Sequence, residues 1–291
     1  MQKTFGKMYY KHVDVFSKHP FSGNSLSVFF LNRNLDDKEM LLITREMRHF
    51  ESIFLYPLNF SSTEFRAKIF TLEEELDFAG HPILGAACAI HDKYFPDQPE
   101  ARTNFKLNIK PLDITTKKYS TYYSAMMEQG APEFITEVPS TLVNDFLAAF
   151  NLSPDNLARL PLEVISTGLS YLIVPLVSGL EQIKHHNVSY LLSKIKAKFV
   201  YFYDINRQEG RTWDNNGIIE DIATGSAAGP LSAYLVKHGI HKAGEIITIN
   251  QGSFLNRPSV IEAIVLGENN EFDNIKIFGN CCIIGEGIIQ Y

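Results

Sequence analysis

Residues 220–235 read EDIATGSAAGPLSAYL, in which two carboxylates precede a run of very small residues and then an apolar stretch. The pattern predicts a buried helix that begins near Ser226. A helix start presents backbone N–H groups and the positive end of the helix dipole, which suit a carboxylate ligand. Gly225 would keep that backbone open to the ligand, and Asp221 would face it. The alternative is an ordinary core helix capped by Asp221, Thr224 or Ser226.

A second stretch, DFAGHPILGAACAIHDKY at residues 77–94, repeats this arrangement of acid, glycine and apolar helix. Its first glycine, Gly80, precedes Gly225 by about half the chain, which predicts an internal duplication. We therefore expect an α+β fold of two similar domains, each a sheet wrapped around a central helix, with both helix starts directed at a shared cleft. Glycine and proline interrupt a strand pattern at MEQGAPEF, residues 127–134. The expected domains are residues 1–127 and 128–291, with the option that the last strand returns to the first domain.

Short runs rich in β-branched and aromatic residues alternate with a few helical patterns along the chain. Strands are predicted at residues 11–16, 26–30, 52–56, 64–70, 105–109, 119–128, 163–166, 171–175, 199–203, 246–250, 260–266 and 275–283. Besides the two central helices, helices are predicted at residues 35–47, 139–150 and 180–195. The predicted strands outnumber the predicted helices.

The composition argues against several classes of protein. The 291 residues carry a net charge of -6 and a pI near 5.9, without a basic stripe, so no nucleic-acid partner is expected. No segment has the apolar length of a membrane span, and the amino end lacks a cleavable apolar segment, so we expect a cytoplasmic protein with no membrane partner. The three cysteines, Cys88, Cys281 and Cys282, cannot all pair, and no CxxC occurs. We interpret them as small core residues and expect neither a disulfide framework nor a metal site.

Two further residues are candidates for proton chemistry. Glu51, in MRHFESIFLY, is a single acid at the beginning of an apolar strand. Such acids usually lie on the surface, but a Glu51 that points inward would have its pKa raised toward the value useful for a general acid or base. His81 stands at the start of the helix in residues 77–94. A lone histidine is more often structural, and its position at the matching helix start favours a functional role.

Long segments of the chain resemble the PhzF-like proteins of phenazine biosynthesis, which share the fold of diaminopimelate epimerase. The segments are VDVFSKHPFSGNSLSVFF, REMRHFESIFLY, FTLEEELDFAGHPILGAA, MEQGAPEF, STGLSYLIVPL, RTWDNNGIIEDIATGSAAGPLSAYLVKHG and NQGSFLNRPSVIEA. The resemblance covers almost the whole chain. It implies two similar domains, each a mostly antiparallel sheet wrapped around a central helix, and it also implies a homodimer and a reaction without a cofactor.

The resemblance also assigns roles to individual residues. It makes Glu51 the proton-transferring group and adds His81 and Asp221 to the catalytic site. The residues that it places around the substrate are Gly80, Gly225, Ser226 and Trp213. Trp213 stands where the family tends to have phenylalanine, and Phe50 stands where a small polar residue is usual, so the shape of the substrate pocket can differ from that of the family.

The epimerases of the same fold use two cysteines as acid and base, each directly before a glycine at a helix start. The corresponding residues here are Ala79 and Thr224, neither of which can replace a thiolate. The resulting hypothesis is an isomerase without cofactor or metal, in which Glu51 moves a proton on a small unsaturated or cyclic carboxylic acid. Two alternatives remain open: a binding protein for small anions that does no chemistry, and a racemase or epimerase that uses Glu51 and Asp221 as opposed bases.

Overall fold

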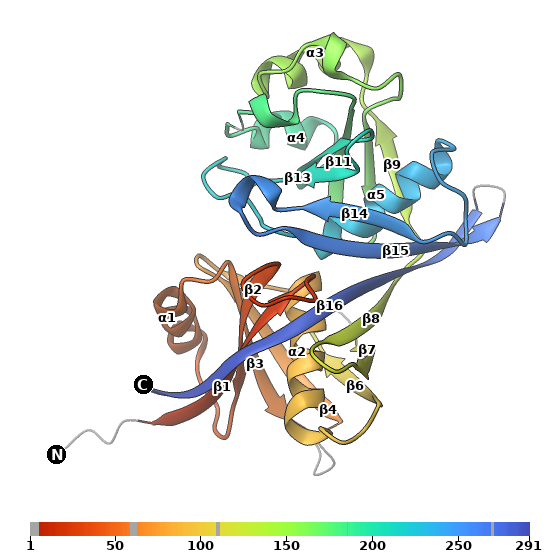
Figure 1. Cartoon of the computed structure of the whole chain (residues 1–291). Helices are drawn as coiled ribbons and strands as arrows, with labels where there is room; N and C mark the ends of the chain where they lie inside the picture. Colours follow the sequence, from red (N-terminus) through yellow and green to blue (C-terminus); the bar gives the residue numbers. More distant parts are fainter. Residues whose placement is uncertain (1–5, 59–62, 109–110, 185, 269–270) are drawn as a thin grey trace. The chain divides into compact units, whose positions relative to one another are not determined.

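The computed structural model describes residues 6–58, 63–108, 111–184, 186–268 and 271–291, and the contacts within it divide the chain into two units (Figure 1). Unit 1 comprises Met1–Glu128 and Phe278–Tyr291, and unit 2 comprises Gln129–Ile277. Two strands, β8 (Tyr123–Gly130) and β16 (Glu271–Gln290), carry residues of both units.

Unit 1 contains a closed circuit of paired strands. Besides β8 and β16, these are β1 (Lys7–Val15), β2 (Asn24–Phe30), β3 (Glu51–Pro57), β4 (Glu64–Thr71), β6 (Glu100–Lys106) and β7 (Pro111–Lys118), with the short β5 (Glu75–Leu76) paired to β4. The strand order is β1-β2-β3-β4-β6-β7-β8-β16, and β1 also pairs with β16, which closes the circuit. The pairs β2–β3 and β4–β6 are parallel, whereas β1–β2, β3–β4, β6–β7, β7–β8 and β1–β16 are antiparallel.

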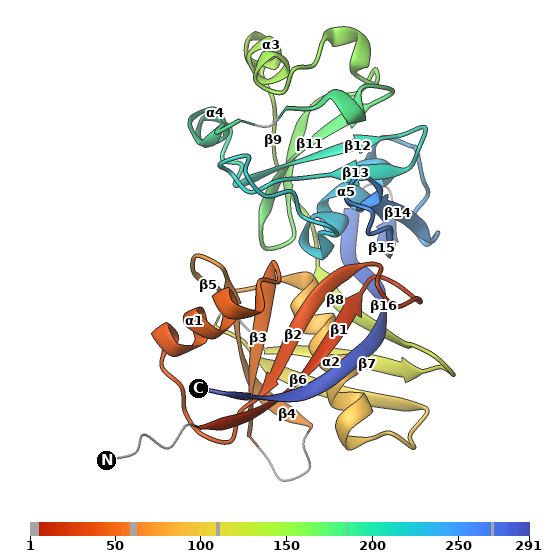
Figure 2. The same cartoon turned by 60° about the vertical axis from the view of Figure 1, so that its left-hand side comes forward.

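Helix α2 (Gly80–Tyr94) lies inside this circuit and packs against β1, β2, β3, β6 and β7 (Figure 2). All of its residues from Gly80 to His91 are buried, as expected for a helix that is apolar on every side. A Cβ atom on Gly85 would lie 2.6 Å from a methyl carbon of Leu26 and 2.7 Å from one of Val15, so the close approach of helix and strands requires glycine. The buried helix predicted in residues 77–94 is confirmed.

Helix α1 (Asp37–Met47) covers a second face of the same strands. Its start is fixed by a capping box, because Asp36 accepts from the backbone N–H of Glu39 while the Glu39 side chain accepts from the N–H of Asp36. The helix ends at Arg48, whose φ is 58°. Met40 and Ile43 pack with buried aromatic side chains of the strands, namely Phe29, Phe54 and Phe70.

Unit 2 has one sheet around a second buried helix. Its strands are β9 (Glu133–Glu137), β10 (Glu163–Ser166), β11 (Ser170–Leu176), β12 (Phe199–Asp204), β13 (Glu209–Arg211), β14 (Ile247–Gln251) and β15 (Ser259–Glu268), in the order β16-β15-β14-β13-β12-β11-β10-β9. Helix α5 (Gly225–Lys237) packs against β10, β11 and β15, which lie near opposite ends of this order. Each unit is thus a sheet with a central helix, and the predicted α+β class is confirmed.

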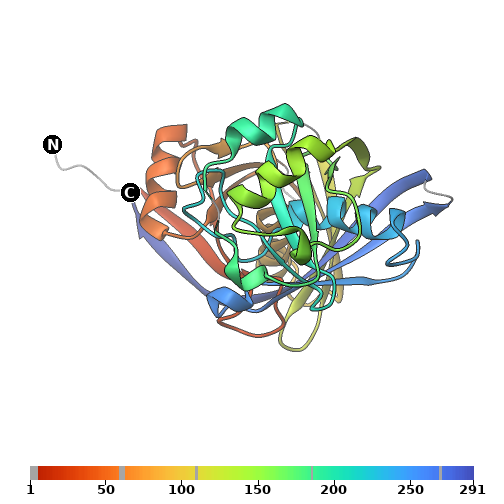
Figure 3. The ribbon, with the colours of Figure 1, turned by 90° about the horizontal axis from the view of Figure 1, so that it is seen from above.

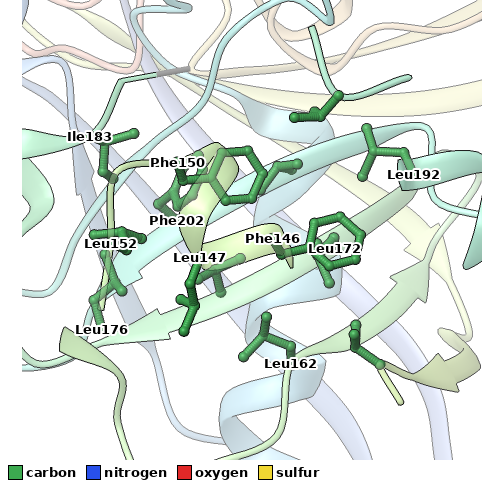
Figure 4. Close-up of a cluster of buried hydrophobic side chains, with 14 of the residues drawn as sticks. Phe146, Leu147, Phe150, Leu152, Leu162, Leu172, Leu176, Ile183, Leu192 and Phe202 are labelled. Carbon is green, nitrogen blue, oxygen red and sulfur yellow. The ribbon is translucent and has the colours of Figure 1, made fainter. Parts of the chain in front are cut away.

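A hydrophobic cluster on β10, β11 and β12 forms a second core of unit 2 (Figure 4). It joins these strands to α3 (Ser140–Ala149) and α4 (Ser189–Lys194), which have the yellow-green and green of their residue numbers in Figure 3. Phe146 and Phe150 stack, and Phe150 meets Phe202 edge to face with ring centres 4.7 Å apart. The described residues of the unit also form short 3-10 helices, namely η1 (Pro154–Asn156), η2 (Leu180–Gln182) and η3 (Ser253–Leu255).

Several predicted elements are wrong in extent. The strand expected at residues 275–283 is part of the longer β16, and the strand expected at residues 119–128 begins only at Tyr123. The helix expected at residues 180–195 is reduced to η2 and α4, and residue 185 between them lies outside the described residues. The strand expected at residues 105–109 is the end of β6, and residue 109 also lies outside the described residues. Strands β5, β7, β9 and β13 were not predicted.

The three cysteines are buried, so the interpretation of these residues as core residues is confirmed. Burial raises the pKa of the Cys88 thiol well above its usual value and that of Cys282 to about 11. None of the helices in the described part of the chain combines the length and the apolar character that crossing a membrane requires.

Candidate functional site

Glu51 is the first residue of β3 and is buried, with 5% of its surface exposed. It pairs with Leu26 on one neighbouring strand and with Thr71 on the other, so its side chain leaves the sheet on the same face as that of Leu26. Leu26 packs against α2 near Gly85, which places Glu51 on the face that carries the central helix. The alternative that Glu51 is a surface acid is therefore wrong.

His81 is the second residue of α2 and comes to Glu51 from the helix side. Its Nδ1 lies 3.1 Å from Oε2 of Glu51 and 3.4 Å from Nδ2 of Asn24, and only 3% of the residue is exposed. Burial, and then the charge of nearby His49, lowers the pKa of His81 to about 3. The imidazole is therefore neutral near pH 7, and its contact with Glu51 is a hydrogen bond between a carboxyl group and a neutral ring.

This pairing links the protonation of Glu51 to the tautomer of His81. An ionised Glu51 accepts a hydrogen bond from Nδ1–H, which leaves Nε2 as an acceptor. When Nδ1 instead accepts, from a protonated Glu51 or from Nδ2 of Asn24, Nε2–H is a donor. Nε2 is buried and has no hydrogen-bond partner among the described residues. A buried polar atom of this kind is expected to bond to a ligand or to ordered water.

The first turn of α2 adds backbone donors beside His81. Ala79 precedes the helix and provides no side-chain cap, and Pro82 has no N–H group. The amide of Ile83 makes the first hydrogen bond inside the helix, to the carbonyl of Ala79, so the residues of the first turn whose amides can donate to a ligand are Gly80 and His81. Together with the helix dipole, they favour a negatively charged group at this end of the helix.

Replacing His81 with asparagine is expected to flatten the pH dependence of the free energy of unfolding between about pH 6 and pH 4. The pKa of His81 is about 3 in the folded protein, whereas an unfolded histidine titrates near pH 6.5, so between these values only the unfolded chain binds the proton. The stability that neutral His81 contributes is present above the unfolded pKa and is lost as the pH falls, by about 1.4 kcal/mol per pH unit. Urea unfolding over this pH range measures both slopes, and equal slopes in the two proteins would contradict the prediction.

Asp221 belongs to unit 2 and lies in the turn before α5, with 8% of its surface exposed. Thr224 directly precedes the helix but makes no side-chain cap to it, and its hydroxyl instead donates to Oδ2 of Asp221 at 2.5 Å. The alternative in which Thr224 caps the helix is therefore wrong. The turn thus holds a carboxylate that accepts a hydrogen bond from a hydroxyl three residues further along the chain.

Gly225 and Ser226 are the first two residues of α5. The carbonyl of Gly225 accepts from Nε2 of Gln129, and the hydroxyl of Ser226 lies 2.7 Å from the hydroxyl of Tyr171. Ser226 is partly exposed and Tyr171 is buried, so Tyr171 orients a hydroxyl that remains accessible at the helix start. Sequence reasoning missed Tyr171, although it lies in the segment STGLSYLIVPL.

Trp213 packs on an ion pair in unit 2. The centre of its ring lies 4.5 Å from the guanidinium carbon of Arg211. The same carbon lies 4.2 Å from the ring centre of Phe254. The guanidinium makes two hydrogen bonds of 2.7 Å to the carboxylate of Glu220, the residue before Asp221. Trp213 also meets Phe202 edge to face, so it joins this ion pair to the hydrophobic core.

The structure brings together two of the predicted catalytic residues, Glu51 and His81, in unit 1. Asp221 and the predicted binding residues Gly225, Ser226 and Trp213 belong to unit 2, and Gly80 belongs to unit 1. In the described part of the chain, no group of three or more His, Cys, Asp or Glu side chains is arranged to hold a metal ion.

Comparison with known proteins gives consistent matches over almost the whole chain. Residues 13–287 match the family model PhzC-PhzF, described as phenazine biosynthesis-like protein. The trans-2,3-dihydro-3-hydroxyanthranilate isomerase of Pseudomonas chlororaphis is 30% identical and aligns over 97% of this chain and 99% of its own. The uncharacterized isomerase YddE of Escherichia coli K12 is also 30% identical, over 94% and 95% of the two chains.

A solved structure of a predicted epimerase from Pseudomonas aeruginosa has a TM-score of 0.91 and 39% identity, and the match covers 98% of this chain and 99% of that chain.

Proposed function

The chain belongs to the PhzC-PhzF family of phenazine biosynthesis-like proteins, a family of isomerases, and on that premise we propose that it moves a proton within a small unsaturated or cyclic carboxylic acid without a cofactor. Glu51 acts as the general acid and base in this proposal. The observation that carries it is the buried contact between Glu51 and His81, in which a carboxyl group meets a neutral imidazole whose Nε2 is available to a ligand.

The proposed reaction begins with removal of a proton by the Glu51 carboxylate. The proton comes from a carbon whose acidity is increased by conjugation, and the electron pair of the broken C–H bond spreads over the conjugated system. Glu51 then returns the proton to another carbon of that system, so the product is an isomer and no further reactant is consumed. A buried carboxylate suits this task because its proton affinity can approach that of a weakly acidic carbon site more closely than an exposed carboxylate can.

His81 and the first turn of α2 hold the substrate in this proposal. Nε2 of His81 can accept from or donate to a hydroxyl or amino substituent, depending on whether Glu51 is ionised or protonated. The amides of Gly80 and His81 favour a negative charge, which supports a carboxylate or an enolate oxygen at this position. We further propose that Asp221 and Ser226 contact polar groups of the substrate, and these two assignments rest on the family resemblance.

The positions of the cysteines support an isomerase that does not use thiols. Ala79 and Thr224 are the residues directly before the two central helices, where the thiol-dependent epimerases carry cysteine. The cysteines of this chain lie instead in the interior of α2 and on β16, and all three are buried. Proton transfer therefore falls to oxygen and nitrogen groups.

Deuterium uptake from heavy water, followed by NMR, tests the proposal. The panel consists of cyclic and unsaturated carboxylic acids and includes trans-2,3-dihydro-3-hydroxyanthranilate, the compound that names the Pseudomonas relatives. We expect uptake at one or two carbons of at least one compound, and we expect it to persist after treatment with iodoacetamide, which alkylates accessible thiolates. Measured binding of these anions without any uptake would favour the non-catalytic binding protein, and uptake abolished by iodoacetamide would favour a thiol mechanism.

A further inference from the structure

Gln251 is the last residue of β14 and is 1% exposed, yet its side-chain amide has a full set of partners. Oε1 accepts from the hydroxyl of Tyr201 at 2.9 Å and from the backbone N–H of Thr224 at 3.1 Å. Nε2 donates to the backbone carbonyl of Asp221 at 2.8 Å and to Oγ1 of Thr224 at 3.1 Å. Gln251 therefore contacts both ends of the turn that carries Asp221.

The orientation of this amide follows from the chemistry of its partners. A backbone N–H can only donate and a backbone carbonyl can only accept, so Thr224 N–H requires Oε1 and Asp221 C=O requires Nε2. Burial raises the pKa of Tyr201 well above its usual value, so its hydroxyl stays protonated and donates to the same Oε1. The hydrogen bonds to these three partners therefore all require the same orientation of the Gln251 amide.

This orientation sets the direction of the next hydrogen bond. Because Nε2 donates to Oγ1 of Thr224, the hydroxyl hydrogen of Thr224 points away from Gln251. It is directed at Oδ2 of Asp221, 2.5 Å away. A hydrogen bond donated to a carboxylate stabilises its ionised form.

We propose that Gln251 is a positioning residue for Asp221, because its amide forces Thr224 to donate a hydrogen bond to the Asp221 carboxylate and so holds that carboxylate ionised in one orientation. The catalytic meaning of this arrangement rests on the proposed function, in which Asp221 contacts the substrate. The arrangement itself is a property of unit 2 without substrate.

The surroundings of the turn are consistent with a fixed geometry. Gly252, which follows Gln251, has a φ of 86°, and a Cβ atom there would lie 2.8 Å from the carbonyl oxygen of Ile222 in the turn. Glycine thus lets β14 approach the turn closely. Glu220, the charged residue next to Asp221 in the chain, forms an ion pair with Arg211. The titratable groups whose charges raise the pKa of Tyr201, besides Asp221, are Tyr171, Tyr203 and Glu209.

Titration of the Asp221 side chain by carbon-13 NMR tests the proposal in substrate-free protein, with the signal assigned from an Asp221→Asn variant. Thr224→Val removes the donated hydrogen bond. It is expected to raise the pH at the midpoint of the Asp221 titration by about one pH unit. Gln251→Glu places a second acceptor opposite Thr224, so the hydroxyl turns toward the introduced carboxylate and away from Asp221, and the midpoint rises again. The new negative charge also raises it by Coulomb repulsion.

The double variant separates these two effects of Gln251→Glu. If Gln251 acts through Thr224, the hydrogen bond is lost once in either variant, and the shift of Thr224→Val with Gln251→Glu falls short of the sum of the single shifts by about one pH unit. Additive shifts would overturn the proposal. Because no substrate is involved, a negative result here is distinct from a failure to find deuterium uptake.

Two further variants serve as controls. Tyr201→Phe removes one partner of Oε1 but leaves the orientation set by the turn, so the midpoint of Asp221 is expected to stay within a few tenths of a pH unit. Thr224→Ser keeps the hydroxyl and is expected to behave in the same way. If Gln251→Glu does not fold, the comparison of Thr224→Val with Thr224→Ser still decides the matter, since equal midpoints in these two proteins would overturn the proposal.

Discussion

A Glu51→Gln variant is expected to catalyse deuterium uptake about a hundredfold to ten-thousandfold more slowly than the wild-type protein, which is the contribution that a positioned general acid and base typically makes. The amide cannot take up the substrate proton at neutral pH. It can still form a hydrogen bond with Nδ1 of His81, which lies 3.1 Å from the carboxylate that it replaces. The fold and the affinity for the substrate are therefore expected to be largely retained.

NMR measurement of uptake and of ligand binding in the same samples checks this expectation. Glu46→Gln is the matched control, because Glu46 is an exposed residue of α1 and the same chemical change there is expected to leave the rate unaltered. Uptake by Glu51→Gln at the wild-type rate would remove Glu51 from the mechanism. A wild-type protein that shows no uptake and binds the anions as well as the variant does would identify a binding protein.

Arg211→Met is expected to lower the free energy of unfolding by about 3–5 kcal/mol, because it leaves Glu220 as a charge without its partner. The side chains of Arg211 and Glu220 are 10% and 11% exposed, and they form two parallel hydrogen bonds. The variant also removes the cation that lies between the rings of Trp213 and Phe254. Urea unfolding measures the loss.

The expected loss depends on the unpaired carboxylate, and two comparisons test that cause. The double variant with Glu220→Met is expected to recover most of the stability, because neither charge is then left alone. Arg102→Met breaks the pair with Asp113, in which the side chains are 72% and 50% exposed, and is expected to change stability by less than about 1 kcal/mol. A double variant as unstable as Arg211→Met alone would show that packing around the guanidinium matters more than charge.

The two central helices could be predicted from sequence because each is long, mostly apolar and begins with glycine. The failure at residues 180–195 has a different cause. Leu180, Ile183, Val188, Leu192 and Ile195 recur at roughly helical spacing, and all of them are buried in the same hydrophobic cluster. That spacing correctly indicated that one side of the segment is buried. The buried side is formed by η2, a loop and α4 together, and not by one continuous helix.

The candidate site was accessible to sequence reasoning only in part. Residue patterns left Glu51 and His81 open between structural and functional roles, and the family resemblance raised them to candidates. The partners Tyr171 and Gln251 were missed because their hydrogen bonds join residues far apart in the chain, 55 positions for Tyr171 with Ser226 and 27 for Gln251 with Thr224. Both lie in segments that carry the resemblance, STGLSYLIVPL and NQGSFLNRPSVIEA, and a hydroxyl or amide within such a segment was the signal available.

The strand pairing of unit 1 also constrains the order of events during synthesis. β1 is synthesised before unit 2, whereas the part of β16 that belongs to unit 1 is synthesised after it. At about 5–20 residues per second, the roughly 150 residues between the two segments of unit 1 take about 8–30 s to synthesise. During that interval, β1 has β2 on one side and an unsatisfied edge on the other, a state in which strands are prone to pair with other chains. The pairing of β1 with β16 must therefore wait until unit 2 has been synthesised, and a chaperone that shields the edge of β1 would act in this interval.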